Sequence, residues 1–248
     1  MPGDEAGAGQ RGAGPLEGVV LRRLALPWLG PLLAVATAVM GWALLDRLPE
    51  RVPIHWGVDG RADGWMSPLS AVAWMPVFIL ALWAFLLGVG RITPGMPRGG
   101  AAWRAYLLLC NAVLLFMAVL QAAVLASAAG APVDPGRWAI PLIGVLFVMI
   151  GALAPHLPQG GINLPLGDDP EYRASVSRFL GRTFVIGGIA VFLVGVLLPP
   201  REGTWVGFIL IMAVSLLPLA YLGLRPPPTR RPPGGWRKGF PDKEERDV

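Results

Sequence analysis

The sequence of 248 residues is poor in charge, since only 15% of its residues are Asp, Glu, Lys or Arg. Soluble domains carry about 25% charged residues, so this chain has too few charges to solvate a globular surface. The charges also gather in short segments and are missing from the long apolar runs between them. Because a charge at the centre of a bilayer costs at least about 2.5 kcal/mol, this distribution indicates a membrane-spanning chain.

Histidine and cysteine are also scarce, with two histidines and one cysteine in the whole chain. The single Cys110 lies inside an apolar run, so the chain cannot form an internal disulfide and offers no thiolate set for a metal. No apolar run contains a nucleophile beside a base or a His/Glu pair, which argues against an intramembrane protease or a metal-dependent hydrolase. We therefore predict no catalytic residue, no cofactor and no metal site, and a protein that is not an enzyme.

What the chain has in abundance is apolar sequence, since 54% of its residues are hydrophobic and its mean hydropathy is +0.56. Six charge-free runs stand out: Leu24–Leu45, Leu69–Gly90, Ala105–Ala129, Trp138–Pro155, Thr183–Pro200 and Gly203–Leu224. A helix needs about 17–25 residues to cross the hydrocarbon core, and the runs lack the alternation of a barrel strand. We therefore predict an all-α membrane protein, a bundle of about six transmembrane helices that crosses the cell membrane as a multi-pass protein.

Polar and aromatic residues of these runs agree with a helical bundle. Asn111 and Gln121 lie within the third run and are predicted to hydrogen-bond neighbouring helices. Because the runs hold no Asp, Glu, Lys, Arg or His away from their ends, the sequence argues against a proton-coupled or ion-coupled transporter. Four tryptophans stand near predicted helix ends, where lipid headgroups lie: Trp28, Trp103, Trp138 and Trp205.

The charges outside the runs give a net charge of +5 and predict the orientation of the bundle. Basic residues that flank apolar helices bind anionic headgroups, so the expected partner is the lipid bilayer and not a nucleic acid. With both termini cytoplasmic, the cytoplasmic segments hold 16 of the 21 Lys and Arg residues, which favours that orientation. The predicted organisation is a disordered cytoplasmic tail over 1–23, a transmembrane domain over 24–224 with a structured outer loop 46–68 and a cytoplasmic loop 156–182, and a basic, Pro-rich cytoplasmic tail over 225–248.

The outer loop is the most informative polar segment, and its core from Leu48 to Pro68 reads LPERVPIHWGVDGRADGWMSP. Its prolines and glycines break helices, so the spacing of four between His55, Asp59 and Asp63 does not predict a helical stripe. The Asp-Gly pairs at 59–60 and 63–64 predict two turns that tolerate positive φ. No ligand spacing of a known structural metal site is present, so we expect His55 and Asp63 to hydrogen-bond each other or the backbone. The loop is predicted to be a compact lid on the outer ends of the helices.

Two stretches of this loop resemble a family signature. Residues 48–56, LPERVPIHW, and 60–64, GRADG, are similar to the pattern LP-x-x-I-P-x-H-[FW]-x-x-x-G-x-x-D-G of the SdpI family of bacterial membrane proteins. That pattern also lies just after the first helix in the family. A second segment, RFLGRTFVIGG at 178–188, resembles the family's entry into a late helix. The family's Gly-Ile-Arg-Thr-Pro motif before that entry is absent here.

The resemblance implies a role in toxin immunity or envelope signalling, with an extracellular toxin peptide and a cytoplasmic repressor as partners. It makes the outer loop the expected ligand-binding surface, through the signature residues Pro53, His55, Trp56, Gly60, Asp63 and Gly64. One alternative is a transporter or permease component for a small molecule or lipid. Another is a membrane enzyme that uses His55 and Asp63 as an acid–base pair on a lipid substrate.

The cytoplasmic loop contains a helix start at Asp169-Pro170-Glu171, with an N-cap candidate, a proline and an acid near the positive end of the dipole. The helix is predicted to continue into the fifth apolar run. Arg178 and Arg182 are four residues apart and share a face of it. Two interpretations stay open: a basic surface that meets lipid headgroups, or a docking site for a cytoplasmic partner through Arg173, Arg178 and Arg182.

Overall fold

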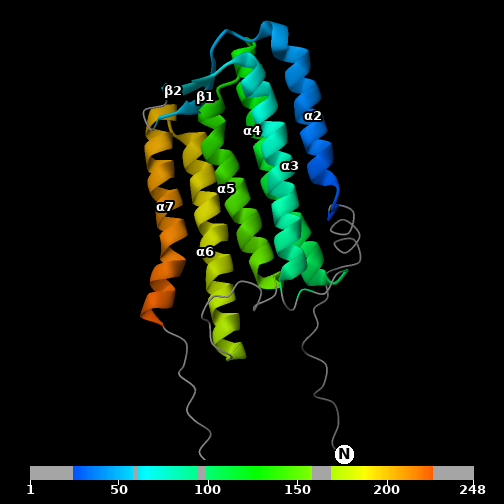
Figure 1. Ribbon diagram of the computed structural model, residues 1–248. Helices are drawn as coiled ribbons and strands as arrows, with labels where there is room; N and C mark the ends of the chain where they lie inside the picture. The colour runs from blue at the N-terminus through cyan, green and yellow to red at the C-terminus, as the bar shows by residue number, and fades with distance from the viewer. Residues whose placement is uncertain (1–24, 58–60, 94–95, 97–98, 158–168, 226–248) are drawn as a thin grey trace, which may run out of the picture.

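The computed structural model describes residues 25–57, 61–93, 96, 99–157 and 169–225. Within them lie six helices long and apolar enough to cross a membrane (Figure 1): α2 Leu29–Leu44, α3 Pro68–Ile92, α4 Ala101–Ala128, α5 Pro135–Leu153, α6 Pro170–Leu197 and α7 Pro200–Leu224. Short 3-10 turns extend α2 (η1, Leu45–Arg47) and α5 (η2, Ala154–His156). The predicted all-α membrane bundle is therefore confirmed.

Several helices begin where the sequence places a capping side chain before a proline. Asp169 caps α6, because its Oδ1 accepts hydrogen bonds from the backbone N–H groups of Glu171 at 2.9 Å and Tyr172 at 3.4 Å. Asp134 caps α5 in the same way. A proline at the first helical position has no N–H to leave unsatisfied, so each cap completes the helix end. The predicted start at Asp169 is confirmed, and α6 runs without a break into its apolar part.

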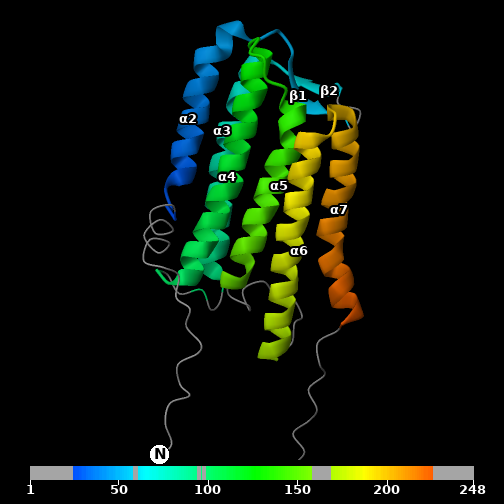
Figure 2. The same cartoon turned by 180° about the vertical axis from the view of Figure 1, so that it is seen from behind.

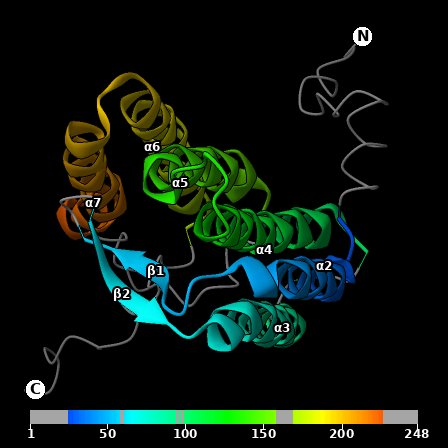
Figure 3. The same cartoon turned by 90° about the horizontal axis from the view of Figure 1, so that it is seen from above.

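The helices form two groups of three that meet along one seam (Figure 3). α2, α3 and α4 pack together, α5, α6 and α7 pack together, and α4 joins the groups by packing against α5. In Figures 1 and 2 the start of α2 and the end of α7 lie at the same end of the bundle, and α6 extends past its neighbours there. Both ends of the described chain therefore leave from one face. That this face is cytoplasmic stays a prediction from the Lys and Arg distribution.

Glycines at intervals of seven bring α5 and α6 into backbone contact. α5 carries Gly144 and Gly151, and α6 carries Gly181, Gly188 and Gly195. A Cβ built on Gly144 would lie 2.5 Å from the backbone nitrogen of Phe192, and one built on Gly151 would lie 2.6 Å from the carbonyl oxygen of Gly181. Small residues let transmembrane helices approach closely when lipid supplies no hydrophobic driving force. The α5–α6 pair is the most closely packed contact of the bundle.

The buried polar side chains of α4 tie the first group of helices together. The amide nitrogen of Gln121 donates to the carbonyl oxygen of Ala71 in α3 at 2.8 Å. The amide nitrogen of Asn111 donates to the carbonyl oxygen of Leu26, just before α2, at 3.2 Å. The predicted hydrogen bonds from the third apolar run to its neighbours are confirmed. The one to Leu26 reaches the entry to the first helix and not the helix itself.

Large apolar side chains cover the outside of the bundle, as a bilayer requires. Val39, Phe85 and Ile186 are each more than 60% exposed, in the middle parts of three different helices. Tryptophans lie near helix ends at both ends of the bundle, and their place at the headgroup level stays a prediction. Trp28 precedes α2 at one end, and Trp138 in the first turn of α5 and Trp205 in the second turn of α7 lie at the other.

The outer loop forms a β-hairpin where a lid of turns is predicted. β1 (Val52–Trp56) pairs antiparallel with β2 (Ala62–Met66) across the ends of the helices (Figure 3). The predicted turn at Asp63-Gly64 is wrong, because both residues lie within β2. The other predicted turn, at 59–60, lies outside the described residues. Short strands of this composition carry no period that distinguishes them from turns.

Candidate functional site

The hairpin packs on the bundle through buried Val52 of β1, with half-buried Met66 of β2 packed against the same cluster. Val52, at the start of β1, is fully buried and packs in a cluster with Ala71 and Val72 of α3 and Leu125 of α4. Pro53 follows and pairs with Trp65 of β2. A two-stranded sheet has only edge strands, which tolerate a proline. Val52 therefore fixes the hairpin on α3 and α4, while the rest of β1 extends beyond them.

Two register shifts direct the side chains of the hairpin. Pro53 pairs with Trp65, His55 pairs with Gly64 and Trp56 pairs with Ala62. Ile54 and Asp63 are the extra residues that these pairings leave as bulges. Bulges twist a strand and redirect side chains, and they are frequent beside functional sites.

His55 and Asp63 form the polar contact of the hairpin. The ring nitrogen Nδ1 of His55 lies 2.5 Å from Oδ1 of Asp63, and both side chains are more than half exposed. Gly64 stands opposite His55, where a Cβ would lie 2.9 Å from the Cβ of His55. The absence of a side chain at 64 thus lets the two strands approach at this pair. The expected hydrogen bond between His55 and Asp63 is confirmed.

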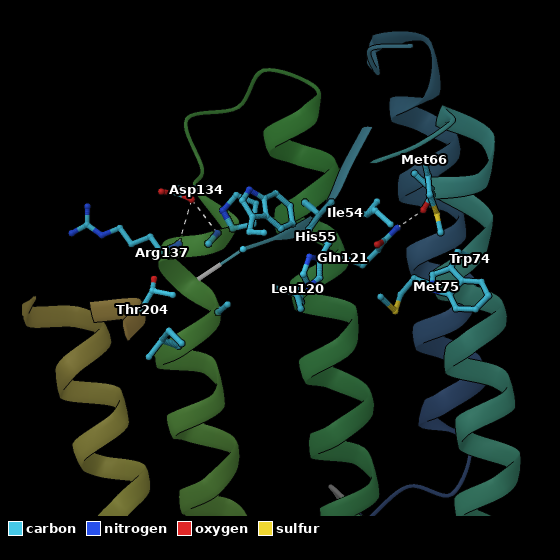
Figure 4. A pocket seen from close by; sticks show the side chains of 18 of the residues that line it. Ile54, His55, Met66, Trp74, Met75, Leu120, Gln121, Asp134, Arg137 and Thr204 are labelled. Atoms are coloured by element: carbon cyan, nitrogen blue, oxygen red, sulfur yellow. Dashed lines mark hydrogen bonds between the residues drawn. The ribbon is translucent and has the colours of Figure 1, made fainter. Parts of the chain in front are cut away.

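A cavity of about 530 Å³ lies beneath the hairpin (Figure 4). The hairpin contributes its roof through β1 and Met66, and α3, α4, α5 and α7 contribute its walls. Its volume falls within the range of about 300–1,000 Å³ of small-molecule sites. The cavity is therefore formed where the two groups of helices face each other under a common cover.

The cavity is polar at its rim and apolar below. Arg137 lies in the first turn of α5 and Arg201 in that of α7, and both line the rim with Asp134. Figure 4 shows Arg137 extending from α5 toward the end of α7 that carries Thr204. Asp134 Oδ1 is already used as the α5 cap, since it accepts from the backbone nitrogens of residues 136 and 137 at 3.0 Å and 3.3 Å. The arrangement fits a ligand with a negatively charged end and an apolar body.

Of the predicted ligand-binding residues, His55 and Trp56 line the cavity. Trp56 reaches the start of α5, where a Cβ built on Gly136 would lie 4.0 Å from its ring. Pro53, Asp63 and Gly64 shape the hairpin without lining the cavity. Gly60, the remaining member of the set, lies outside the described residues.

Sequence reasoning missed the cavity residues that come from the helices, above all Trp74, Arg137 and Arg201. One signal was available for the two arginines. Each is the single basic residue of its predicted outer loop, and each stands at the start of an apolar run. Trp74 gave no signal of its own, because an apolar residue in a transmembrane helix is ordinary.

The candidate docking residues of α6 do not form one surface. Arg178 and Arg182, in the third and fourth turns of α6, are exposed on a shared face, whereas Arg173 is half-buried with its Nε atom enclosed. The start of α6 is joined to the end of α7. The hydroxyl of Tyr172 donates to the carbonyl oxygen of Arg225 at 2.5 Å, and a stacked aromatic pair lies between the two helices.

Within the described residues, no group of three or more His, Cys, Asp and Glu side chains lies close enough together to hold a metal ion. The ion pair found in the described part of the chain, His55 with Asp63, has both side chains more than half exposed. Such a pair orients the strands of the hairpin. The site is instead characterised by its apolar walls and by two exposed arginines at its rim.

Comparison with known protein families finds a match over part of the chain. Residues 32–80 match a domain of unknown function, DUF1648. The matched segment runs from α2 through the hairpin to the middle of α3, so it contains the whole hairpin and the Val52 anchor. No curated protein and no solved structure matches the chain.

Proposed function

We propose that this protein is a non-enzymatic membrane receptor of the SdpI type, which gives toxin immunity, senses an envelope signal, or does both. The observation that supports the proposal most is the cavity of about 530 Å³ whose roof is the hairpin with the family-like signature. A peptide or lipid-associated ligand would bind there and contact His55 and Trp56. The hairpin end would face the outside, as the excess of Lys and Arg at the other end predicts.

Binding would be transmitted because the cavity lies between the two groups of helices. A ligand seated there touches α3 and α4 on one side and α5 and α7 on the other. The group of α5, α6 and α7 would move as a unit, because α5 and α6 touch through backbone atoms at the glycines. Backbone atoms have no alternative rotamers, so the two helices cannot shift independently. The far half of this group carries the exposed pair Arg178 and Arg182, where a cytoplasmic repressor or the headgroup layer would detect the shift.

Two tryptophans of the hairpin provide a matched test of this proposal. Trp56 lines the cavity, whereas Trp65 is 47% exposed and does not. A strain that lacks the gene is challenged with the peptides secreted by its own parent strain and complemented with each variant. We expect wild type and Trp65→Ala to restore growth, and Trp56→Ala to fail at equal amounts of membrane-inserted protein.

A second variant tests the cavity itself and not the hairpin. Ala139 lines the cavity from α5, so Ala139→Trp would fill space that the ligand needs. We expect it to abolish protection as well. If deletion of the gene leaves sensitivity to every co-produced peptide unchanged, immunity is the wrong role.

A further inference from the structure

The walls of the cavity change from charged to apolar along the axis of the bundle. Arg137 and Arg201 lie in the first turns of α5 and α7. Trp74 lies six residues into α3, which is about 9 Å below the helix start at 1.5 Å per residue. Ile140 and Leu120 continue the apolar wall on α5 and α4. A lipid in one leaflet has the same order, with its phosphate at the helix ends and its acyl chains deeper.

The lining of the cavity also includes a side chain at the outer surface of the bundle. α3 and α7 both line it, yet no packed interface joins these two helices in the described part of the chain. Trp74 lines the cavity while 56% of its surface is exposed, and it stacks on Phe78, which is 38% exposed on the outer surface of α3. A lining side chain that is more than half exposed, beside two helices without a packed interface, makes the gap between α3 and α7 the route by which a lipid would reach the cavity.

The charge at the rim selects the headgroup. Among the described residues, no ion pair joins Arg137 or Arg201 to a carboxylate. The nearest acid of the lining, Asp134, has one carboxylate oxygen engaged by two backbone N–H groups of α5. Guanidinium groups bind phosphate oxygens in a bidentate manner and lose less entropy per hydrogen bond than an ammonium group does. The rim thus complements a phosphodiester that carries no balancing positive charge.

We propose that the cavity binds one anionic phospholipid of the outer-facing leaflet, which enters laterally between α3 and α7. Its phosphate lies against Arg137 and Arg201, one acyl chain lies along Trp74, and the hairpin covers the glycerol region. This assignment rests on the proposed function, since it names the class of ligand that the receptor site takes. An anionic lipid is a component of the envelope, so the receptor would respond when a toxin or another stress displaces it.

The test measures lipid binding directly. The full chain is purified in detergent and titrated with phosphatidylglycerol, with phosphatidylcholine of the same chains, and with glycerol phosphate, while native mass spectrometry counts bound molecules. We expect each protein molecule to retain one phosphatidylglycerol and no glycerol phosphate. The affinity for phosphatidylcholine should be at least tenfold lower than that for phosphatidylglycerol. The double variant R137Q/R201Q should bind phosphatidylglycerol with at least tenfold lower affinity than the wild type.

A matched control removes two exposed arginines from the opposite end. The double variant R91Q/R225Q has the same change in net charge and should alter the affinity less than twofold, because neither residue lines the cavity. A photoreactive phosphatidylglycerol with its diazirine in the acyl chain should label peptides of α3 and α4 near Trp74 in the wild type. Ala139→Trp should reduce that labelling.

Equal affinity for the two lipids, equal losses in the two double variants, or glycerol phosphate bound as tightly as the lipid would each overturn the assignment. An acidic amphipathic peptide that binds at the cavity while phosphatidylglycerol does not would identify the occupant as a peptide and also overturn it. These results are separate from the growth assay. If phosphatidylglycerol does not bind but Trp56→Ala still abolishes protection, the lipid assignment is wrong and the receptor function stands.

Discussion

The α5–α6 contact predicts a strong effect from the smallest substitution, Gly188→Ala. A Cβ at 188 would lie 2.7 Å from both the carbonyl oxygen of Gly144 and the backbone nitrogen of Val148. Ordinary contacts begin at 3.4 Å, so the two helices would have to separate by several tenths of an ångström. Because the opposing atoms belong to the backbone, no rotamer change can relieve the clash.

The loss of stability follows from the contacts that the separation of α5 and α6 weakens. Contacts along the whole interface lengthen together, and dispersion attraction weakens over a gap of 0.5–1 Å by roughly a quarter to a half. Overpacking in well-packed interiors costs about 1–3 kcal/mol, and we expect Gly188→Ala to destabilise the bundle by that amount. The measurement is unfolding in mixed micelles of increasing SDS content, followed by circular dichroism.

Gly88 of α3 provides the matched control, since a Cβ built there meets nothing within 4 Å. Gly88→Ala is the same chemical change in a transmembrane helix, and the gain in helix propensity should leave stability unchanged or raise it by up to about 1 kcal/mol. Equal stabilities of Gly188→Ala and Gly88→Ala would refute the reasoning, because they would show that α5 and α6 do not meet at their backbones.

Three further substitutions test other parts of the structure. Asp169→Ala should lose two hydrogen bonds at the start of α6 and cost about 1 kcal/mol in the same unfolding assay, whereas Asp169→Ser should retain most of the stability. Gly64→Val should force β2 away from His55, and faster hydrogen exchange or proteolysis of the hairpin would report it; unchanged protection would contradict the close pairing. Gln121→Leu should cost about 0.6–2 kcal/mol, because it removes the buried bond to Ala71, and a variant as stable as wild type would show that the bond contributes nothing.

The helices could be predicted because their cause is local. A charge-free run of sufficient length is stable in hydrocarbon only as a helix, because its backbone groups must pair with each other. The pair Asp169-Pro170 indicates a helix start from local residues alone. The first run shows the limit of such reasoning. It was predicted from Leu24, yet α2 begins at Leu29, just after Pro27. The predicted tail 1–23 and all but the first residue of the predicted tail 225–248 lie outside the described residues, so those predictions stand as made. Of the predicted cytoplasmic loop 156–182, residues 158–168 also lie outside them, whereas residues 170–182 belong to α6.

The hairpin and the cavity could not be predicted because their causes lie far apart in the sequence. Val52 becomes an anchor only through Leu125, more than seventy residues away. The seven-residue spacing of glycines in α5 and α6 is visible in the sequence, but it indicates a contact only once the two helices are known to be neighbours. The cavity draws its walls from four helices, and their arrangement in two groups follows from the packing of all six.

The account depends most on the claim that a ligand occupies the space beneath the hairpin, and photocrosslinking in living cells tests it directly. Benzoylphenylalanine is placed at Trp56, which lines the cavity, or at Trp65, which lies on the same hairpin outside it. We predict that residue 56 crosslinks to an amphiphile from the envelope, and that residue 65 does so several times less. Equal yields at the two positions, or no adduct at residue 56, would contradict the account.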